Sequence, residues 1–316
     1  MDVVSIGETM VKFDPDRIGR LRTIESFHRF AGGAENNTMI GLSRLGYKSK
    51  MISFMGDDEF GRYLIMCMSG EGVDVSHIKM LEGGQTGIFF VERNIIEDCK
   101  SFYYRSNSAM HKFSPDYLTD EMFGDAKIFY ITGITSLISD SCADAVNKAV
   151  EMAKERGMKI AIDPNIRLKM ASKEKIRKLI KPLMQQCDYV FPNDSELKLL
   201  YPDRTEEEAA NELIQNGVEV VVVKKGENGA EAYTEKNKYN IESYKLRAIA
   251  STMGAGDAFN AGFISGILDK DDINMCLKKA CAMGAFAVMG YDPYLMLPEK
   301  KELMEFIQGE KSTIVR

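Results

Sequence analysis

Apolar residues along the first part of the chain change their spacing, and this change predicts alternating strands and helices. Residues 1–8 and 50–56 form short apolar runs of strand length. Residues 34–45 instead repeat apolar side chains every third position, and Gly46 follows where a glycine often ends a helix. We therefore predict a strand, a helix and a second strand, which together form a β-α-β unit.

The same alternation continues through the second half of the chain. Thr205 and Glu208 have the spacing of a capping box at a helix start, and residues 218–223 are almost all β-branched, which is typical of a strand buried on both faces. Such alternation builds a parallel sheet covered by helices. The predicted strands are residues 128–132, 159–163, 189–191 and 218–223, and the predicted helices are residues 141–156, one that begins near 172 and one that begins at 205.

Two stretches interrupt this alternation. Residues 12–30 and 85–104 show period-two or extended patterns, which suit antiparallel strands outside the main sheet. We predict that segments of about 12–31 and 84–110 form a small β lid. No linker rich in Pro, Gly or Ser divides the chain, so a single domain over residues 1–316 is expected.

Composition and charge favour a globular protein with a small-molecule partner. The 41 Lys and Arg residues are scattered and are outnumbered by 47 Asp and Glu, which disfavours nucleic acid or an anionic membrane as partner. No apolar stretch approaches the ~20 residues of a membrane span, and no export signal is visible, so we expect a cytoplasmic location. The six cysteines form no CxxC pair, which favours reduced thiols over a zinc site or disulfides.

Residues 251–263 carry the most informative chemistry. Gly254 and Gly256 flank Ala255 in a turn that precedes a small and aromatic helix pattern, so backbone N–H groups at a helix N-terminus can hold an anion there. Asp257 in the first turn can accept a hydroxyl proton while the helix dipole stabilises a phosphoryl group. The alternative is an ordinary strand-to-helix turn capped by Asp257. Neither a GxGxxG fingerprint nor a P-loop is present.

The segment 251–259, STMGAGDAF, resembles the late signature D-T-x-G-A-G-D-x-F of the PfkB, or ribokinase-like, family of carbohydrate kinases. The early signature of that family is matched by GGAENN at 32–37 and by GDDEFG at 56–61. The resemblance implies an α/β fold, namely a ribokinase-like three-layer α/β/α sandwich with a mostly parallel central sheet and a small β-sheet lid. It also implies the use of ATP and Mg²⁺.

The same resemblance implies roles for individual residues. Asp257 becomes the catalytic base, and Gly254, Ala255 and Gly256 form an anion hole. Asn193 and Glu196 match an N-x-x-E motif that orders Mg²⁺ through water, which is physically reasonable because magnesium keeps several waters. The residues expected to bind the nucleotide are Asn193, Lys224, Gly226, Gly229, Gly254 and Gly256.

Within the family, the segments 86–90, 103–109, 132–135 and 163–167 resemble 2-keto-3-deoxygluconate kinases. A carboxylate substrate also calls for guanidinium groups, which Arg105 and Arg167 can supply. The alternative is that these arginines are surface charges or join the lid to the body. The residues expected to bind the substrate are Gly33, Asn37, Phe89, Tyr103, Arg105, Ile134, Arg167 and Asp257.

Three alternatives stay open. The acceptor could be fructose or another neutral sugar, and a sugar-binding protein without catalysis is a rival of another class. Ser251 replaces the first Asp of the late signature, which in cation-activated relatives helps to bind a monovalent ion, so dependence on such an ion is left open. A homo-oligomer formed through the lid is expected.

Overall fold

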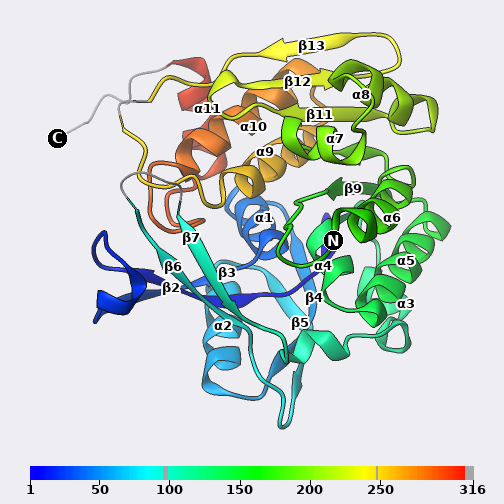
Figure 1. Ribbon diagram of the computed structural model, residues 1–316. Helices are drawn as coiled ribbons and strands as arrows, with labels where there is room; N and C mark the ends of the chain where they lie inside the picture. Colours follow the sequence, from blue (N-terminus) through cyan, green and yellow to red (C-terminus); the bar gives the residue numbers. More distant parts are fainter. Residues whose placement is uncertain (95–98, 247, 310–316) are drawn as a thin grey trace.

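Helices cover both faces of a central sheet in the computed structural model, which describes residues 1–94, 99–246 and 248–309 (Figure 1). Within these residues the main sheet has nine strands in the order β13-β12-β11-β10-β9-β8-β1-β4-β5. Only the pairs β11–β12 and β12–β13 are antiparallel. The fold class predicted from the sequence is therefore confirmed. None of the helices in these ranges is both long and apolar enough to span a membrane.

The strands of the main sheet are short; β4, β8, β9 and β10 are each followed by a helix, whereas β1 and β5 lead into strands of a second sheet. The main-sheet strands are β1 (Val3–Ile6), β4 (Ser49–Gly56), β5 (Asp74–Leu81), β8 (Ile128–Thr132), β9 (Lys159–Asp163), β10 (Tyr189–Val190), β11 (Val220–Lys224), β12 (Ala230–Tyr233) and β13 (Lys238–Ile241).

Two helical layers enclose this sheet. One layer contains α3 (Asp120–Phe123), α4 (Gly133–Ile138), α5 (Asp140–Glu155), α6 (Lys173–Met184), α7 (Asp194–Leu200) and α8 (Glu206–Gln215). The other contains α1 (Ala34–Arg44), α2 (Glu59–Gly70), α9 (Ala255–Asp269), α10 (Ile273–Ala287) and α11 (Lys300–Gln308). Short 3-10 turns lie at Leu21–Thr23, Ala109–Lys112, Pro115–Tyr117 and Gly226–Asn228.

Strand β11 explains why a continuous β-branched run predicts a strand that is buried on both faces. Val221 and Val223 join the hydrophobic core on one face, whereas Val220 and Val222 join the core on the other. Because successive side chains of a strand point to opposite faces, both faces must be apolar when helices cover both. The predicted strands 128–132 and 159–163 coincide with β8 and β9, and both capping-box hydrogen bonds are present at the start of α8.

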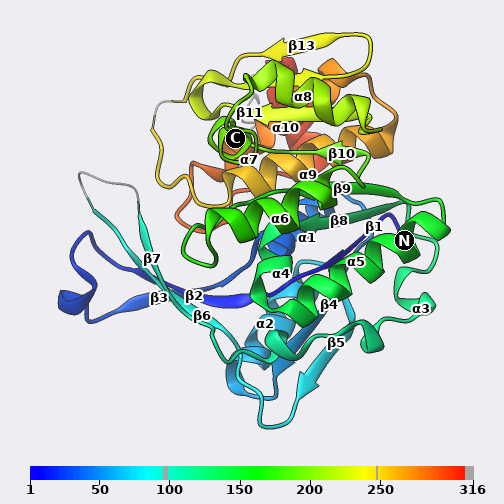
Figure 2. The same cartoon turned by 45° about the vertical axis from the view of Figure 1, so that its right-hand side comes forward.

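A second sheet, which we call the lid sheet, projects from the main body (Figure 2). Its strand order is β3-β2-β6-β7, with β2 (Met10–Pro15), β3 (Phe27–Gly32), β6 (Ile88–Glu92) and β7 (Lys100–Tyr104). Two antiparallel hairpins, β2–β3 and β6–β7, join through a parallel pair between β2 and β6. The prediction of antiparallel strands is wrong for that central pair, because side-chain alternation does not encode the direction of a neighbouring strand.

Helix α9 packs unusually closely against its two neighbours. A side chain at Gly262 would begin 2.5 Å from the backbone oxygen of Lys279 in α10. On the other side, a side chain at Gly41 of α1 would begin 2.9 Å from the Cβ of Ala261. Both distances are shorter than real contacts, so the helix backbones approach as near as glycine permits. Helix α9 is therefore fixed between α1 and α10.

Candidate active site

The glycine turn predicted from the sequence lies at the N-terminus of α9. Gly254 is the N-cap residue, with φ of 86°, and the helix begins at Ala255. A side chain at Gly254 would also begin 2.9 Å from the Cβ of Pro293, so backbone conformation and packing both require glycine. The N–H of Ala255 donates a 3.3 Å hydrogen bond to the backbone oxygen of Thr252, whereas the N–H of Gly256 lies at the positive end of the helix dipole, where it can hold an anion.

Asp257 lies in the first turn of α9 and is 8% exposed. Its Oδ2 accepts a hydrogen bond of 2.8 Å from Asn37 Nδ2, and its backbone oxygen accepts one of 3.1 Å from Thr38 Oγ1. Burial raises the pKa of the Asp257 carboxyl to about 7, and the nearby positive charges of Lys224 and Arg167 oppose that shift. A carboxyl group with this pKa can take up a proton at neutral pH.

A second buried carboxylate lies beside the glycine turn, at the end of β9. Asp163 Oδ2 accepts hydrogen bonds of 2.6 Å from Lys224 Nζ and 2.7 Å from Asn260 Nδ2. Lys224 ends β11, and its Nζ lies 3.5 Å from the point where a side chain at Gly256 would begin. The ammonium group is thus next to the anion-binding turn.

Asn193 and Glu196 form a capping box at the start of α7. Glu196 Oε2 accepts from Asn193 N at 2.9 Å, and Glu196 Oε1 accepts from Ile166 N at 2.7 Å. Asn193 and Lys224 share a β-bridge, which places the box beside the lysine. Burial and then the charge of Asp163 raise the pKa of Glu196.

The charge balance of this region suits a divalent cation. Asp163, Glu196 and Asp257 contribute three buried carboxyl groups, and Lys224 contributes one ammonium group among them. Across the described ranges, no three His, Cys, Asp or Glu side chains gather closely enough to hold a metal ion by themselves. The residues therefore fit a magnesium ion held through water and phosphate oxygens rather than one enclosed by protein ligands.

The predicted nucleotide-binding glycines lie just beyond Lys224. Gly226 and Gly229 lie in the turn between β11 and β12, and a side chain at Gly229 would overlap the backbone oxygen of Ile241. This packing explains the glycine at 229 without reference to a ligand, so its role in nucleotide binding stays a prediction.

On the lid side of the site, Arg105 is paired with a buried carboxylate. Its guanidinium forms an ion pair with Glu8, and the two side chains are 12% and 2% exposed. Glu8 follows β1, whereas Arg105 follows β7, so the pair joins the lid sheet to the main sheet. Gly33 lies against the backbone of Glu8, because a side chain at Gly33 would begin 2.5 Å from the backbone oxygen of Glu8.

The remaining predicted substrate residues come from the lid sheet, the loop after β9 and the start of α4. The rings of Phe89 and Tyr103 are 5.3 Å apart; Phe89 is buried, and Tyr103 is 41% exposed. Lys169 Nζ donates to the backbone oxygen of Ser101 in β7 at 3.5 Å, which brings the exposed Arg167 and its loop beside the lid sheet. The list of predicted substrate residues is completed by Ile134, half-buried in the first turn of α4.

Several buried polar residues of the site were not predicted. Glu35 accepts hydrogen bonds of 2.6 Å from both Thr132 and Thr135, and burial raises its pKa. Glu8 and Asp163 follow or end predicted strands, and polar residues at carboxyl ends of parallel strands are a signal that could have identified them. Asn260 lies one helical turn after Asp257, so the helical period could have identified it as well.

Comparison with known proteins shows the family to which the chain belongs. Residues 1–300 match the model of the pfkB family carbohydrate kinases. The chain belongs to the pfkB family. This pfkB kinase is 29% identical over 314 residues to 2-dehydro-3-deoxygluconokinase of Bacillus subtilis, with 99% of this chain and 97% of the relative covered.

Other relatives of this pfkB kinase have different names. It is 32% identical over 316 residues to probable fructokinase-2 of Arabidopsis thaliana, with 97% of this chain and 95% of the relative covered. The crystal structure of a putative ribokinase II from E. coli in complex with ATP and Mg²⁺ matches with a TM-score of 0.91 and 31% identity, over 98% of this chain and 99% of that one. The relatives thus divide between sugar-acid and neutral-sugar kinases.

Proposed function

We propose that this pfkB kinase transfers the γ-phosphoryl group of ATP to the terminal hydroxyl of 2-keto-3-deoxygluconate. The observation that carries the proposal is the buried Asp257 beside the N-terminus of α9, with Asn37 holding one carboxylate oxygen and its pKa raised to about 7. A sugar-binding protein without catalysis would have no need for a buried carboxylate of this kind, because an ionised group in such a place is costly.

In the proposed reaction, Asp257 accepts the hydroxyl proton as the sugar oxygen forms its bond to the γ-phosphorus. The bond from that phosphorus to the β-phosphate oxygen breaks, and ADP leaves. The N–H group of Gly256 at the start of α9, together with Lys224, stabilises the charge on the phosphoryl oxygens. Asn37 orients the Asp257 carboxylate toward its substrate.

Mg²⁺ would neutralise part of the triphosphate charge when it is bound. Asn193 and Glu196 would hold it through water, and Asp163 adds negative charge on the same side. Support comes from the E. coli neighbour in complex with ATP and Mg²⁺. For a monovalent cation the chain offers less, since Ser251 is buried and its Oγ accepts from Met253 N at 3.2 Å.

The sugar acid is favoured over a neutral sugar by Arg167. Among the described residues no carboxylate forms an ion pair with this exposed guanidinium, and its charge acts on the buried Asp257. A substrate carboxylate can occupy that position with planar, charge-assisted hydrogen bonds.

Fructose is the second candidate acceptor. The ion pair with Glu8 already compensates the charge of Arg105, so this arginine can donate hydrogen bonds to sugar hydroxyls without requiring an anion. The fructokinases among the relatives support the same alternative.

The deciding experiment is an ADP-release assay with 2-keto-3-deoxygluconate, its C4 epimer, fructose and ribose. We expect the sugar acid to give the highest kcat/KM. Turnover of fructose at least as efficient as that of the acid would remove the carboxylate argument, and calorimetric sugar binding without any ADP release would favour the non-catalytic protein. The same preparations give the oligomeric state by sedimentation.

We also propose a homo-oligomer through the lid sheet and a cytoplasmic location. Support for the oligomer is the edge strand β7, where Phe102, Tyr103 and Tyr104 are 40%, 41% and 63% exposed. A monomer in sedimentation at micromolar concentration would contradict that part.

A further inference from the structure

Residues 290–297, which we call the junction loop, contact three separate parts of the molecule. The loop is ordered from within, because Asp292 Oδ1 accepts hydrogen bonds from the backbone N of Tyr294, at 3.0 Å, and of Leu295. Asp292 is 8% exposed and Tyr294 is 4% exposed. The loop is therefore a compact turn rather than an extended connection.

The first contact of the junction loop is with the anion-binding turn. Pro293 packs directly behind Gly254, with its Cβ and Cα 2.9 and 3.0 Å from the point where a side chain would begin. Gly254 is also the N-cap residue of α9, and its φ is left-handed. A shift of Pro293 would thus change the backbone on which the predicted anion hole depends.

The second contact is with the lid sheet, through Tyr291. Lys12 Nζ of β2 donates a 2.7 Å hydrogen bond to the backbone oxygen of Tyr291, and the Arg93 guanidinium lies 3.7 Å from the centre of its ring. Both cations are held by Asp14, at 2.5 Å from Lys12 and 2.6 Å from Arg93. Lys12 and Asp14 are 1% and 2% exposed, so this ionic group is part of the lid-sheet interior.

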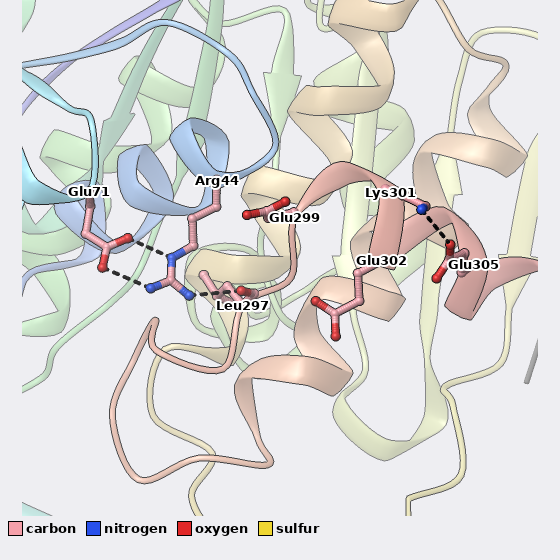
Figure 3. Close-up of a pocket in the computed structure, with 7 residues that line it drawn as sticks. All are labelled: Arg44, Glu71, Leu297, Glu299, Lys301, Glu302 and Glu305. Carbon is pink, nitrogen blue, oxygen red and sulfur yellow. Dashed lines mark hydrogen bonds and ion pairs between the residues drawn. The ribbon is translucent and has the colours of Figure 1, made fainter. Parts of the chain in front are cut away.

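The third contact fixes the far end of the loop to the main body. Arg44 of α1 donates 2.9 Å hydrogen bonds to the backbone oxygens of Leu295 and Leu297, while Glu71 holds the same guanidinium (Figure 3). The hydrogen bonds to Glu71 raise the pKa of Arg44. The end of the loop at Leu297 is therefore attached to the body, and the end at Tyr291 is attached to the lid sheet.

A contact outside the junction loop also joins the anion-binding turn to the lid sheet. Met253, the residue before Gly254, packs against the small hydrophobic cluster of the lid sheet formed by Met10, Phe89 and Val91. The anion-binding turn thus touches the lid sheet directly through Met253 and indirectly through the junction loop.

We propose that Tyr291 is a positioning residue, which transmits the position of the lid sheet through Pro293 to the Gly254 turn. The anion hole is then correctly formed only when the lid sheet holds Tyr291. The expected loss of kcat rests on the proposed function. The coupling between the lid sheet and the Gly254 turn rests only on the contacts described above.

The test compares Tyr291→Ala with Arg29→Ala. Tyr291 is 55% exposed, so its removal leaves the core intact. Arg29 lies 3.8 Å over the ring of Tyr63 and joins β3 to α2, so it is a lid-to-body contact of the same kind that involves neither Tyr291 nor Pro293. We expect Tyr291→Ala to lower kcat by about 10- to 100-fold, with the KM for ATP changed less than about 2-fold and Tm preserved, because small misplacements of catalytic groups are costly.

The control variant Arg29→Ala should keep kcat within about 2-fold. Arg93→Ala should lower kcat like Tyr291→Ala, and the double variant should lose no more than the larger single loss, since both changes break one connection. Equal kcat values for Tyr291→Ala and Arg29→Ala would overturn the proposal, as would a loss of kcat that follows Tm.

Hydrogen–deuterium exchange of the segment 251–260 supplies a readout that needs no sugar substrate. Exchange there should be at least several-fold faster in Tyr291→Ala than in wild type or Arg29→Ala. If wild type phosphorylates none of the acceptors, the proposed function fails, and the exchange result alone decides the coupling. Unchanged exchange in Tyr291→Ala overturns it.

Discussion

The two halves of the site differ in how their charges are balanced. On the phosphate side, the carboxyl groups of Asp163, Glu196 and Asp257 share the ammonium group of Lys224 and come from β9, α7 and α9 respectively. On the sugar side, Arg105 is compensated by Glu8, and the lid sheet contributes aromatic residues that are partly exposed. The comparison teaches that excess carboxylate charge marks the half where an ion and a phosphate are expected. In the sugar half Arg105 is compensated, whereas Arg167 has no carboxylate partner among the described residues.

The largest expected effect removes the carboxylate that distinguishes the phosphate side. Asp257→Asn keeps the shape of the side chain, so ATP binding should survive while kcat falls by about 10²- to 10⁴-fold, the usual cost of losing a general base. In wild type, kcat should rise with pH through about 7 as Asp257 loses its proton. Calorimetry measures ATP binding to Asp257→Asn, and ADP release at several pH values gives kcat. Near-normal turnover by Asp257→Asn would show that the base is another group.

The next effect concerns Lys224, the ammonium group that pairs with Asp163. Lys224→Met would leave Asp163, which is 3% exposed, without its cation, so the free energy of unfolding should fall by roughly 3 to 5 kcal/mol at pH 7. Lys159→Met is the matched control, because Lys159 also contacts two carboxylates, Asp188 and Glu219, but is 44% exposed; it should cost about 1 kcal/mol or less. Urea denaturation measures the free energy of unfolding of both variants. Similar losses of this free energy would contradict the distinction between the buried and the exposed ion pair.

A smaller effect follows from the raised pKa of Asp257. Folding must keep this carboxyl ionised at pH 8, although its pKa rises from 3.8 to about 7, which costs up to about 4 kcal/mol at ~1.4 kcal/mol per pKa unit. Asp257→Asn should therefore stabilise the protein most at pH 8, less at pH 5 and not at all below pH 3.8, where the aspartate is protonated in both states. Thermal unfolding at these pH values measures it, and a gain independent of pH would argue against the ionisation cost.

The smallest effect tests the sugar side. Arg167→Gln should lower kcat/KM for 2-keto-3-deoxygluconate by about 10- to 100-fold, the value of one charge-assisted pair, and should change the value for fructose less than about 3-fold. Lys169→Gln, two residues away on the same loop, is the control for general charge. Equal losses for both acceptors would mean that Arg167 does not select a carboxylate.

The sequence predicted local features well. The β-branched run at β11 and the capping box of α8 depend on neighbouring residues, so their patterns are visible in the chain. The signature around Asp257 likewise located the turn and helix α9.

Features that join distant segments were predicted only in part: a contact of Arg105 between lid and body was one alternative, but its partner Glu8 was not identified. The Glu8–Arg105 pair joins two strands of different sheets, and the parallel pairing of β2 with β6 depends on how two hairpins meet. Tyr291 was not singled out either, since an exposed tyrosine in a loop has no periodic signal of its own. Such contacts are fixed by tertiary packing, which local pattern does not encode.

The glycine contacts of α9 have a mechanical consequence. Gly41 and Gly262 leave no free space between this helix and its two neighbours, so a sliding movement of α9 would force overlap on one side or the other. The lid sheet is attached differently, because its contacts with the body include side chains such as the Glu8–Arg105 ion pair and Arg29 over the Tyr63 ring. The helix that carries the base is therefore held by its own backbone, and the sheet on the sugar side is held by side chains.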